Sequence, residues 1–395
     1  MKRQVNKLGK VELPSGWKSV RLGDVCEIIM GQSPSSEFYN ICNAGMPLIQ
    51  GNADIKNRKT IIRIFTSQIT KTAQKGDIIM SVRAPVGEIA STEFDCCIGR
   101  GVCAIRGNQY IYYYLEFFES KWYRLSQGST FDSITGELLN NLPIPFPSLS
   151  EQKAIAEILT NADKLIVAKE RLIVAKQKQK QWLMQNLLTG KRRLSGFSGE
   201  WEKAKLGEVC KVNGGGTPST KNKDYWNGHI PWISSSDIID GDIYNIFPTR
   251  FITESAINNS ATQICPKNTI LIVSRVGVGK IAIAPFDLCT SQDFTNLSNI
   301  NQNVMYITFI LAMLFKKTKF RSQGTSIKGL TVNEIKNIHI RIPPLPEQQA
   351  IANVLTTADR EIELLKKELE QHKQIKKYLM QKLLTGKIRV KGASE

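Results

Sequence analysis

The chain has 395 residues, of which 42% are hydrophobic, so it is long enough to form two or three domains with real cores. Its 53 lysines and arginines exceed its 35 acids and give a net charge of +18, which favours a nucleic acid or another polyanion as partner. The longest apolar run, residues 306–315, is half the roughly 20 residues that a membrane-spanning helix needs, and the first residues lead into no apolar signal segment. We therefore expect neither a membrane protein nor a secreted one, and the cytoplasm is the expected location.

The first block of the chain reads as short strands with intervening polar turns. Residues 47–50 and 78–82 are apolar runs of strand length, and the second delivers Arg83 into a glycine-bearing turn. Residues 110–118 predict a short apolar helix, and a polar loop at residues 126–131 precedes a proline-rich strand. This block therefore predicts a domain of mixed strands and helices.

A second block repeats the first in the same order. Residues 231–234, 267–279 and 306–315 correspond to residues 47–50, 75–87 and 110–118. The entry Leu-Gly-x-Val-Cys also occurs twice, ending at Cys26 and at Cys210. The repeat predicts two similar α+β domains, each of roughly 150 residues, which is a usual domain size.

Each block is followed by a long helical segment, and the two segments match without a gap. The start Pro-x-Leu-x-Glu-Gln-x-Ala-Ile-Ala occurs at 147–156 and 343–352, and the end Leu-Met-Gln-x-Leu-Leu-Thr-Gly-Lys at 183–191 and 379–387. Gly190 and Gly386 are placed as C-caps. A heptad stripe indicates coiled-coil packing, and close to forty residues would form a rod of roughly 55 to 60 Å. The stripe comprises Ile155, Leu159, Ala162, Ile166, Ile173, Leu183 and Leu187 in the first helix, and Ile351, Leu355, Ala358, Ile362, Leu365, Leu369, Leu379 and Leu383 in the second.

Two such helices in one chain most simply pair antiparallel, related by an approximate twofold axis in a nearly cyclic layout. The end of the chain would then lie near its beginning. Polar breaks in the stripe at Lys176, Lys180, His372 and Lys376 would fall towards opposite ends of the pair. The expected domains are residues 1–148, a spacer helix at 149–190, residues 191–344, and a second spacer helix with the tail at 345–395.

The sequence offers no catalytic or metal-binding motif. Eight cysteines include no C-x-x-C pair, and the chain has three histidines, so we expect buried, reduced thiols rather than a zinc site. No phosphate loop or dinucleotide fingerprint is present, because residues 277–280 lack the spacing and the hydroxyl residue of a phosphate loop. These observations favour a binding protein over an enzyme.

The duplicated helix start, the duplicated helix end and the Leu-Gly-x-Val-Cys entries together resemble the specificity subunit of type I restriction-modification enzymes. The resemblance covers nearly the whole chain. It implies two target recognition domains that each read half of a split double-stranded DNA sequence, and helices that space them and dock methyltransferase subunits, two in number. It also implies a chain that catalyses nothing, binds no cofactor and acts in the cytoplasm of a bacterium or archaeon. S-adenosylmethionine would be bound by the methyltransferase subunits, and ATP and Mg would serve the restriction subunits.

Candidate DNA contacts lie on loops between the predicted strands, where arginine favours guanine and asparagine or glutamine favours adenine. Arg83 and Arg275 are the leading candidates because both follow an apolar strand and recur. Ion pairs with neighbouring acids are the alternative role for both. The full set is Gln32, Ser33, Ser35, Asn52, Arg83, Arg100, Ser129 and Thr130 in the first half, and Thr217, Ser219, Lys221, Ser234, Ser236, Arg275, Lys280, Gln292, Thr325 and Lys328 in the second. The predicted docking residues on the outer face of the helix starts are Glu151, Gln152, Glu347 and Gln348.

The loops differ between the halves while the helices are nearly copied, so we expect two different half-sites with centres about one helical turn, near 34 Å, apart. Two alternatives remain open. A stand-alone basic coiled-coil scaffold would bind RNA or other nucleic acid without a methyltransferase, and a self-contained methyltransferase would bind S-adenosylmethionine by itself.

Overall fold

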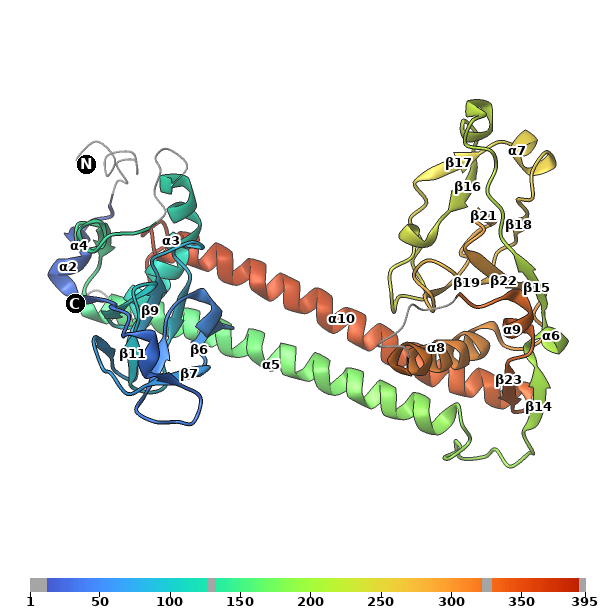
Figure 1. Ribbon diagram of the computed structural model, residues 1–395, viewed down its shortest axis with the longest axis horizontal. Coiled ribbons are helices and arrows are strands. Elements are labelled where there is room, and N and C mark those ends of the chain that lie inside the picture. The colour runs from blue at the N-terminus through green and yellow to red at the C-terminus, as the bar shows by residue number, and fades with distance from the viewer. Residues whose placement is uncertain (1–12, 127–132, 322–328, 391–395) are drawn as a thin grey trace. The chain divides into compact units, whose positions relative to one another are not determined.

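The computed structural model describes residues 13–126, 133–321 and 329–390 (Figure 1). The chain divides into two units. Unit 1 takes the chain up to Glu170 and again from Lys367, and unit 2 runs from Arg171 to Lys366. Each unit contains one sheet-rich domain and a part of both long helices, so the predicted repeat of a mixed α+β domain with a long helix is confirmed.

Unit 1 is built on two sheets, one of six strands in the order β2-β12-β9-β10-β6-β5 and one of five in the order β3-β7-β4-β11-β8. All four residues of β9 are buried, as expected of an apolar strand with neighbours on both sides. The first strand of the domain, β1, pairs antiparallel with its last strand, β13, in a two-stranded ribbon. The strands are β1 Lys18–Arg21, β2 Glu27–Met30, β3 Tyr39–Asn40, β4 Met46–Ile49, β5 Ile55–Lys56, β6 Lys59–Thr60, β7 Ile64–Thr66, β8 Thr72–Ala73, β9 Ile78–Ser81, β10 Ile89–Ser91, β11 Cys96–Ile98, β12 Val102–Arg106 and β13 Pro143–Phe146.

Unit 2 repeats this arrangement with fewer strands. Its sheets have the orders β15-β22-β19-β20 and β17-β16-β21-β18, and β14 and β23 form the ribbon. Strand β16 runs parallel to β21, as β4 runs parallel to β11 in unit 1. The strands are β14 Glu202–Lys205, β15 Lys211–Gly214, β16 Ile230–Ile233, β17 Arg250–Ile252, β18 Ile264–Cys265, β19 Ile270–Val273, β20 Ile281–Ile283, β21 Leu288–Thr290, β22 Phe294–Ser298 and β23 His339–Ile342.

Short helices α4 (Gly136–Asn140) and α9 (Val332–Lys336) occupy matched places in the two domains, and a threonine side chain caps each of them. The Thr135 hydroxyl accepts from the Leu138 amide at 3.2 Å, and the Thr331 hydroxyl accepts from the Glu334 amide at 3.2 Å. The short helices are α2 Leu22–Val25, α4 Gly136–Asn140, α6 Leu206–Val209, α7 Glu254–Asn258 and α9 Val332–Lys336, with 3-10 turns η2 Ser36–Phe38, η3 Asn52–Asp54, η4 Lys223–Trp226 and η5 Ser235–Asp237.

Helices α3 (Gln109–Ser126) and α8 (Val304–Arg321) join the sheets to the long helices. Tyr110 of α3 lies in one apolar cluster with Ile155 and Leu159 of the first long helix. Tyr306 of α8 lies in the corresponding cluster with Ile351. The domain cores are therefore continuous with the helices that follow them.

The long helices are α5 (Leu149–Leu187) and α10 (Leu345–Leu383), each of 39 residues. Gly190 and Gly386 both have φ of +70°, the left-handed conformation that suits a glycine C-cap. The residues of the predicted stripe are buried or half-buried along both helices. The prediction of their starts, ends and apolar face is confirmed.

Within each unit the parts of α5 and α10 run antiparallel. In unit 1, Asp163 pairs with Lys376 at 2.7 Å, and Lys169 pairs with Glu368. The same inverse order occurs in unit 2, where Lys176 and Lys180 pair with Glu361 and Asp359. The lysines that interrupt the stripe are therefore neutralised by acids of the opposite helix.

The end of the described chain lies beside its beginning, as predicted. Arg389 donates to the backbone oxygen of Ser15 at 2.8 Å. No helix in the described residues is long and apolar enough to cross a membrane.

The eight cysteines are free thiols. Burial raises the pKa of Cys26 and of Cys210 to about 11, which keeps both thiols protonated at neutral pH. The expectation of buried thiols fails at Cys42, which is exposed in the loop before β4. In the parts of the chain that the structure describes, His, Cys, Asp and Glu side chains form no group that could hold a metal ion.

Candidate nucleic-acid interface

Arg83 and Arg275 lie at equivalent positions, two residues beyond β9 and β19. Both side chains are exposed. The backbone before each arginine is held in the same way, because the Ile134 amide donates to the oxygen of Val82 at 2.8 Å and the Leu330 amide donates to that of Ser274 at 2.7 Å. Within the described residues neither guanidinium forms an ion pair, so both are available to an external anion.

A second pair of matched positions differs in chemistry. The Arg100 amide donates to the Ser33 hydroxyl at 3.1 Å, and the Gln292 amide donates to the Thr217 hydroxyl at 3.4 Å. Ser33 and Thr217 therefore hold the loop backbone. Because the backbone is held in the same way, the exposed side chains of Arg100 and Gln292 extend from equivalent places. The Arg100 side chain is cationic and the Gln292 side chain is neutral.

In unit 2 these positions line one cleft of about 590 Å³. Arg275 and Gln292 both contribute to it, although they are 17 positions apart in the chain. Glycine at 215 is required by the tight backbone, since a Cβ there would lie 2.1 Å from the oxygen of Ser291. The lining residues are Gly214, Gly215, Ser274, Arg275, Gln292, Phe294, Thr295, Gly329, Leu330, Thr331 and Val332.

The predicted DNA contacts fall into three groups. Exposed side chains that suit an external partner are Gln32, Ser35, Arg83, Arg100, Ser219, Lys221, Ser236, Arg275 and Gln292. Half-buried side chains are Ser33, Asn52, Thr217, Ser234 and Lys280. Ser129, Thr130, Thr325 and Lys328 lie outside the described residues.

Two of the half-buried residues, Lys280 and Ser234, have hydrogen-bond partners within the chain. The Lys280 ammonium donates to the backbone oxygens of Ser235 at 2.8 Å and Ile238 at 3.0 Å, so it holds the turn after β16. The Ser234 hydroxyl accepts from Arg250 at 2.5 Å. Both side chains have structural partners that an external phosphate or base would have to displace.

A repeated arginine–aspartate contact is not among the predicted features. Arg63 lies 3.4 Å from Asp54, and Arg250 lies 3.5 Å from Asp237. Each aspartate is buried and also accepts from a backbone amide at the end of the preceding strand. Recurrence of an aspartate three residues after Gly51 and three after Ser234 was the signal that could have revealed it.

The four predicted docking residues are buried, and that prediction is wrong. Glu151 accepts from Arg389 at 2.6 Å and 2.8 Å, and Glu347 accepts from Arg193 at 2.9 Å and 2.5 Å. The tryptophan of each domain entry, Trp17 or Trp201, also donates to its glutamate.

The glutamines beside them serve the same inward face. Gln152 donates to the backbone oxygen of Pro147 at 2.9 Å, and Gln348 donates to that of Pro343 at 2.8 Å. Gln152 also accepts from Asn108 at 2.7 Å. All four side chains therefore fix the helix starts to the domains, and none of the four is exposed to a partner.

Comparison with known proteins agrees with this architecture. The model of the type I restriction modification DNA specificity domain matches residues 14–176 and 198–374. A putative type I restriction enzyme MjaX specificity subunit from Methanocaldococcus jannaschii is 39% identical over 191 residues, which are 46% of this chain and 45% of that protein. The type I restriction enzyme MjaIX specificity subunit of the same organism is 25% identical over 97% of this chain and 95% of its own length.

Solved structures show the same fold. A chain from a structure described as the basis of complex assembly and conformational transition of the type I R-M system has a TM-score of 0.66 and 21% identity, covering 95% of this chain and all of that one. The type I restriction-modification S subunit from M. genitalium has a TM-score of 0.58 and 19% identity, covering 96% of this chain and 98% of its own. With two matched domains, two matched long helices and a family match over both halves, this chain belongs to the specificity subunits of type I restriction-modification systems.

Proposed function

We propose that this chain is the non-catalytic, DNA-reading subunit of a type I restriction-modification complex, and that it recognises an asymmetric target in two separate halves. The observation that carries the proposal is the matched pair of exposed arginines, Arg83 and Arg275. One stands beyond the central strand of each domain, so each domain presents one reading surface.

The chemistry of this surface suits duplex DNA. The charge of +18 supplies phosphate attraction that weakens with salt, and a guanidinium can bind the O6 and N7 acceptors of guanine together. In unit 2, Gln292 lines the same cleft as Arg275, and a glutamine amide can bind the donor and acceptor edge of adenine. One cleft thus combines the two side-chain types that read purines.

The halves of the target should differ because the reading surfaces differ. Arg100 in the first domain stands where Gln292 stands in the second. Strands β3, β5 and β6 belong to the sheets of the first domain and have no counterpart among the described strands of the second. An asymmetric, bipartite target follows from this difference.

Catalysis is assigned to partner subunits. Methyltransferase subunits would bring S-adenosylmethionine, and restriction subunits would bring ATP and Mg. The complex would act in the cytoplasm, where the host DNA lies.

Because the predicted docking glutamates are buried, we propose instead that the methyltransferase subunits dock on exposed apolar side chains that recur on the long helices. Leu149 and Leu345 open α5 and α10, and Trp182 and Tyr378 occupy equivalent positions near their ends. All four are about half exposed, and each has its counterpart at the equivalent position of the other helix. One methyltransferase subunit would bury Leu149 and Tyr378 of unit 1, and a second would bury Trp182 and Leu345 of unit 2.

The test is co-expression of the full chain with the methyltransferase subunits of its host, followed by single-molecule methylome sequencing. We expect one split, non-palindromic motif to be methylated, and a stable complex on size-exclusion chromatography. A palindromic motif would contradict two different readers. No complex and no methylation would contradict the function, and preferential binding of RNA by the isolated chain would favour the stand-alone scaffold.

Docking has its own control. Leu149→Ser with Tyr378→Ser should weaken the complex, whereas Lys153→Ala with Lys377→Ala, which change exposed lysines on the same two helices, should leave it intact. Equal complex formation by both double variants would exclude this surface.

A further inference from the structure

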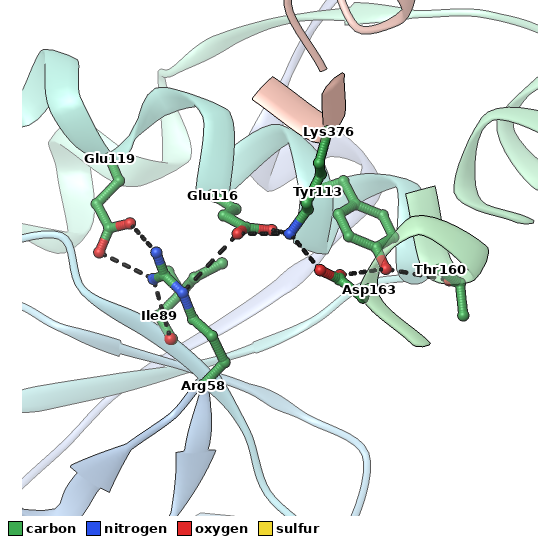
Figure 2. Close-up of polar contacts among 8 residues, drawn as sticks. All are labelled: Arg58, Ile89, Tyr113, Glu116, Glu119, Thr160, Asp163 and Lys376. Atoms are coloured by element: carbon green, nitrogen blue, oxygen red, sulfur yellow. Dashed lines mark hydrogen bonds and ion pairs between the residues drawn. The ribbon is translucent and has the colours of Figure 1, made fainter. Parts of the chain in front are cut away.

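In unit 1 a group of charged side chains lies between the domain and the two long helices (Figure 2). None of the predicted DNA contacts belongs to this group. Its centre is Lys376 of α10, whose side chain is 12% exposed. The ammonium lies 2.8 Å and 3.0 Å from the two oxygens of Glu116 on α3 and 2.7 Å from Asp163 on α5. One cation therefore connects three helices.

Glu116 also faces a second cation, which comes from the sheet. Arg58 lies in the turn between β5 and β6, with its Nε 3.8 Å from Glu116. Its two terminal nitrogens donate to Glu119, one turn further along α3, at 3.0 Å and 2.7 Å. Figure 2 shows Glu116 between the two cations, one from the domain and one from the helix pair.

The arginine is held firmly at this place. Arg58 has φ of +63°, a conformation that a non-glycine residue adopts when its surroundings require it. Burial alone would lower its pKa, but the hydrogen bond and the charges of Glu119 and Glu116 outweigh that effect and raise it. Arg58 therefore stays charged at any pH at which the protein is folded.

Asp163 completes the connection to α5. Its carboxylate accepts a hydrogen bond of 2.9 Å from the Tyr113 hydroxyl, which also contacts Thr160 at 3.1 Å. The contacts therefore run from the β5–β6 turn through α3 to both long helices without a gap longer than an ion-pair distance.

In unit 2 the ion pair between the two long helices is the same, but the contact from the domain to these helices is different. Lys180 pairs with Asp359, as Lys376 pairs with Asp163. Ala312 and Phe315 occupy the positions of Glu116 and Glu119, and the domain reaches the helix pair through the Tyr244 hydroxyl, 2.9 Å from Asp359. The helix contacts are common to both units, whereas the contact from the domain is particular to each.

We propose that Glu116 is a positioning residue that fixes the angle of the first recognition domain on the helix pair of unit 1. Apolar packing of α3 supplies attraction but little direction, whereas charge-assisted hydrogen bonds are directional. Since the proposed function requires two half-sites at a fixed spacing, an error in this angle displaces one reader from its half-site. The inference rests on that proposed function and adds a residue that sets spacing without touching DNA.

The experiment compares Glu116→Gln with Glu119→Gln in the full chain assembled with its methyltransferase subunits. Both substitutions remove one charge from α3 beside Arg58, but Glu116 alone of the two contacts Lys376. Methylation is measured on the native target and on targets whose spacer is one base pair longer or shorter. We expect E116Q to lower the preference for the native spacer by about tenfold, and E119Q to leave that preference unchanged.

The outcomes separate the two claims. Equal spacer preference in E116Q and the wild-type complex would overturn the positioning role. A wild-type complex without any spacer preference would instead count against the proposed function. A loss of methylation that is equal for all spacers would show that Glu116 only stabilises the fold and would also overturn the inference.

A second pair of variants tests the same contact by changing lysines of α10. Lys376→Gln should lower the spacer preference as E116Q does, and Lys373→Gln, which changes an exposed lysine one turn away, should not. If E116Q and K376Q both fail to assemble while their controls assemble, the contact is needed for folding and the positioning role is wrong.

Discussion

The indole N–H of Trp17 donates a hydrogen bond of 3.0 Å to the carboxylate of Glu151, which lies 134 positions later in the chain. Trp201 makes the same contact to Glu347 at 3.2 Å. In each unit the first residues of the domain are thereby fastened to the start of the long helix that follows it. Arg389 and Arg193 neutralise the two glutamates.

The first prediction concerns these indoles. Trp17→Phe keeps an aromatic ring but leaves a buried carboxylate without one donor, so it should lower the free energy of unfolding by about 2 kcal/mol. Urea denaturation measures the loss, and Trp201→Phe should give a similar one. Trp182→Phe, at an exposed indole, is the control and should change little. If W17F and W182F are equally stable, the Trp17–Glu151 bond contributes nothing.

The second prediction uses the two C-cap glycines. Alanine at position 190 or 386 meets the same left-handed backbone, a strain of about 1 kcal/mol. A Cβ at 386 would also lie 2.5 Å from Pro14, whereas the nearest atom to a Cβ at 190 is 3.5 Å away. Gly386→Ala should therefore lower the thermal midpoint more than Gly190→Ala. An equal effect would show that Pro14 moves aside freely.

The third prediction is a pH dependence. The hydrogen bond and charge of Lys169 lower the pKa of Glu368 below its ordinary value of 4.5. A carboxyl whose folded pKa is lowered stabilises the fold above its unfolded pKa, and this contribution is lost as the pH falls through the folded pKa. The difference in thermal midpoint between the wild type and Glu368→Gln should be present at neutral pH and disappear below that lowered value.

The control for this titration is Glu157→Gln, at an exposed position on α5. Its midpoint should follow the wild type at every pH. A difference between wild type and E368Q that persists unchanged in strong acid would mean that the ion pair with Lys169 is not its cause.

The fourth prediction separates base reading from phosphate attraction. Arg275→Ala should weaken binding of the native target by about 1–3 kcal/mol and relax the choice of base at one position of one half-site. Lys221→Ala, at an exposed lysine of the same domain, should weaken binding to all sequences alike and reduce the salt slope by about one. Fluorescence anisotropy with the assembled methyltransferase at several salt concentrations measures both. A uniform loss in R275A would assign Arg275 to phosphate.

Helices and strands could be predicted where residues close together in the sequence mark them. Proline and glutamate at each long-helix start, the apolar stripe, and the glycines at 190 and 386 defined both helices to within a few residues. Arg83 and Arg275 were found because an apolar strand and a glycine turn flank each one. These signals lie within a few residues of the feature they predict.

The failures concern partners that are distant in the chain. Glu151 looked like an exposed first-turn acid, and nothing near it indicates that Trp17 and Arg389 bury it. Lys280 resembled a free basic residue, because its acceptors at Ser235 and Ile238 are backbone oxygens that no side-chain pattern reveals. A local pattern specifies which groups a residue offers, and the tertiary fold decides which of them remain available.

Each of the two lysine–aspartate pairs joins α5 to α10 within one unit, Asp163 with Lys376 in unit 1 and Lys180 with Asp359 in unit 2. A reversal of charge in one helix alone, such as Asp359→Lys, would place two cations side by side, whereas an exchange of both partners would keep the attraction. Changes at these positions should therefore arise in pairs, so that the two helix segments of a unit evolve together.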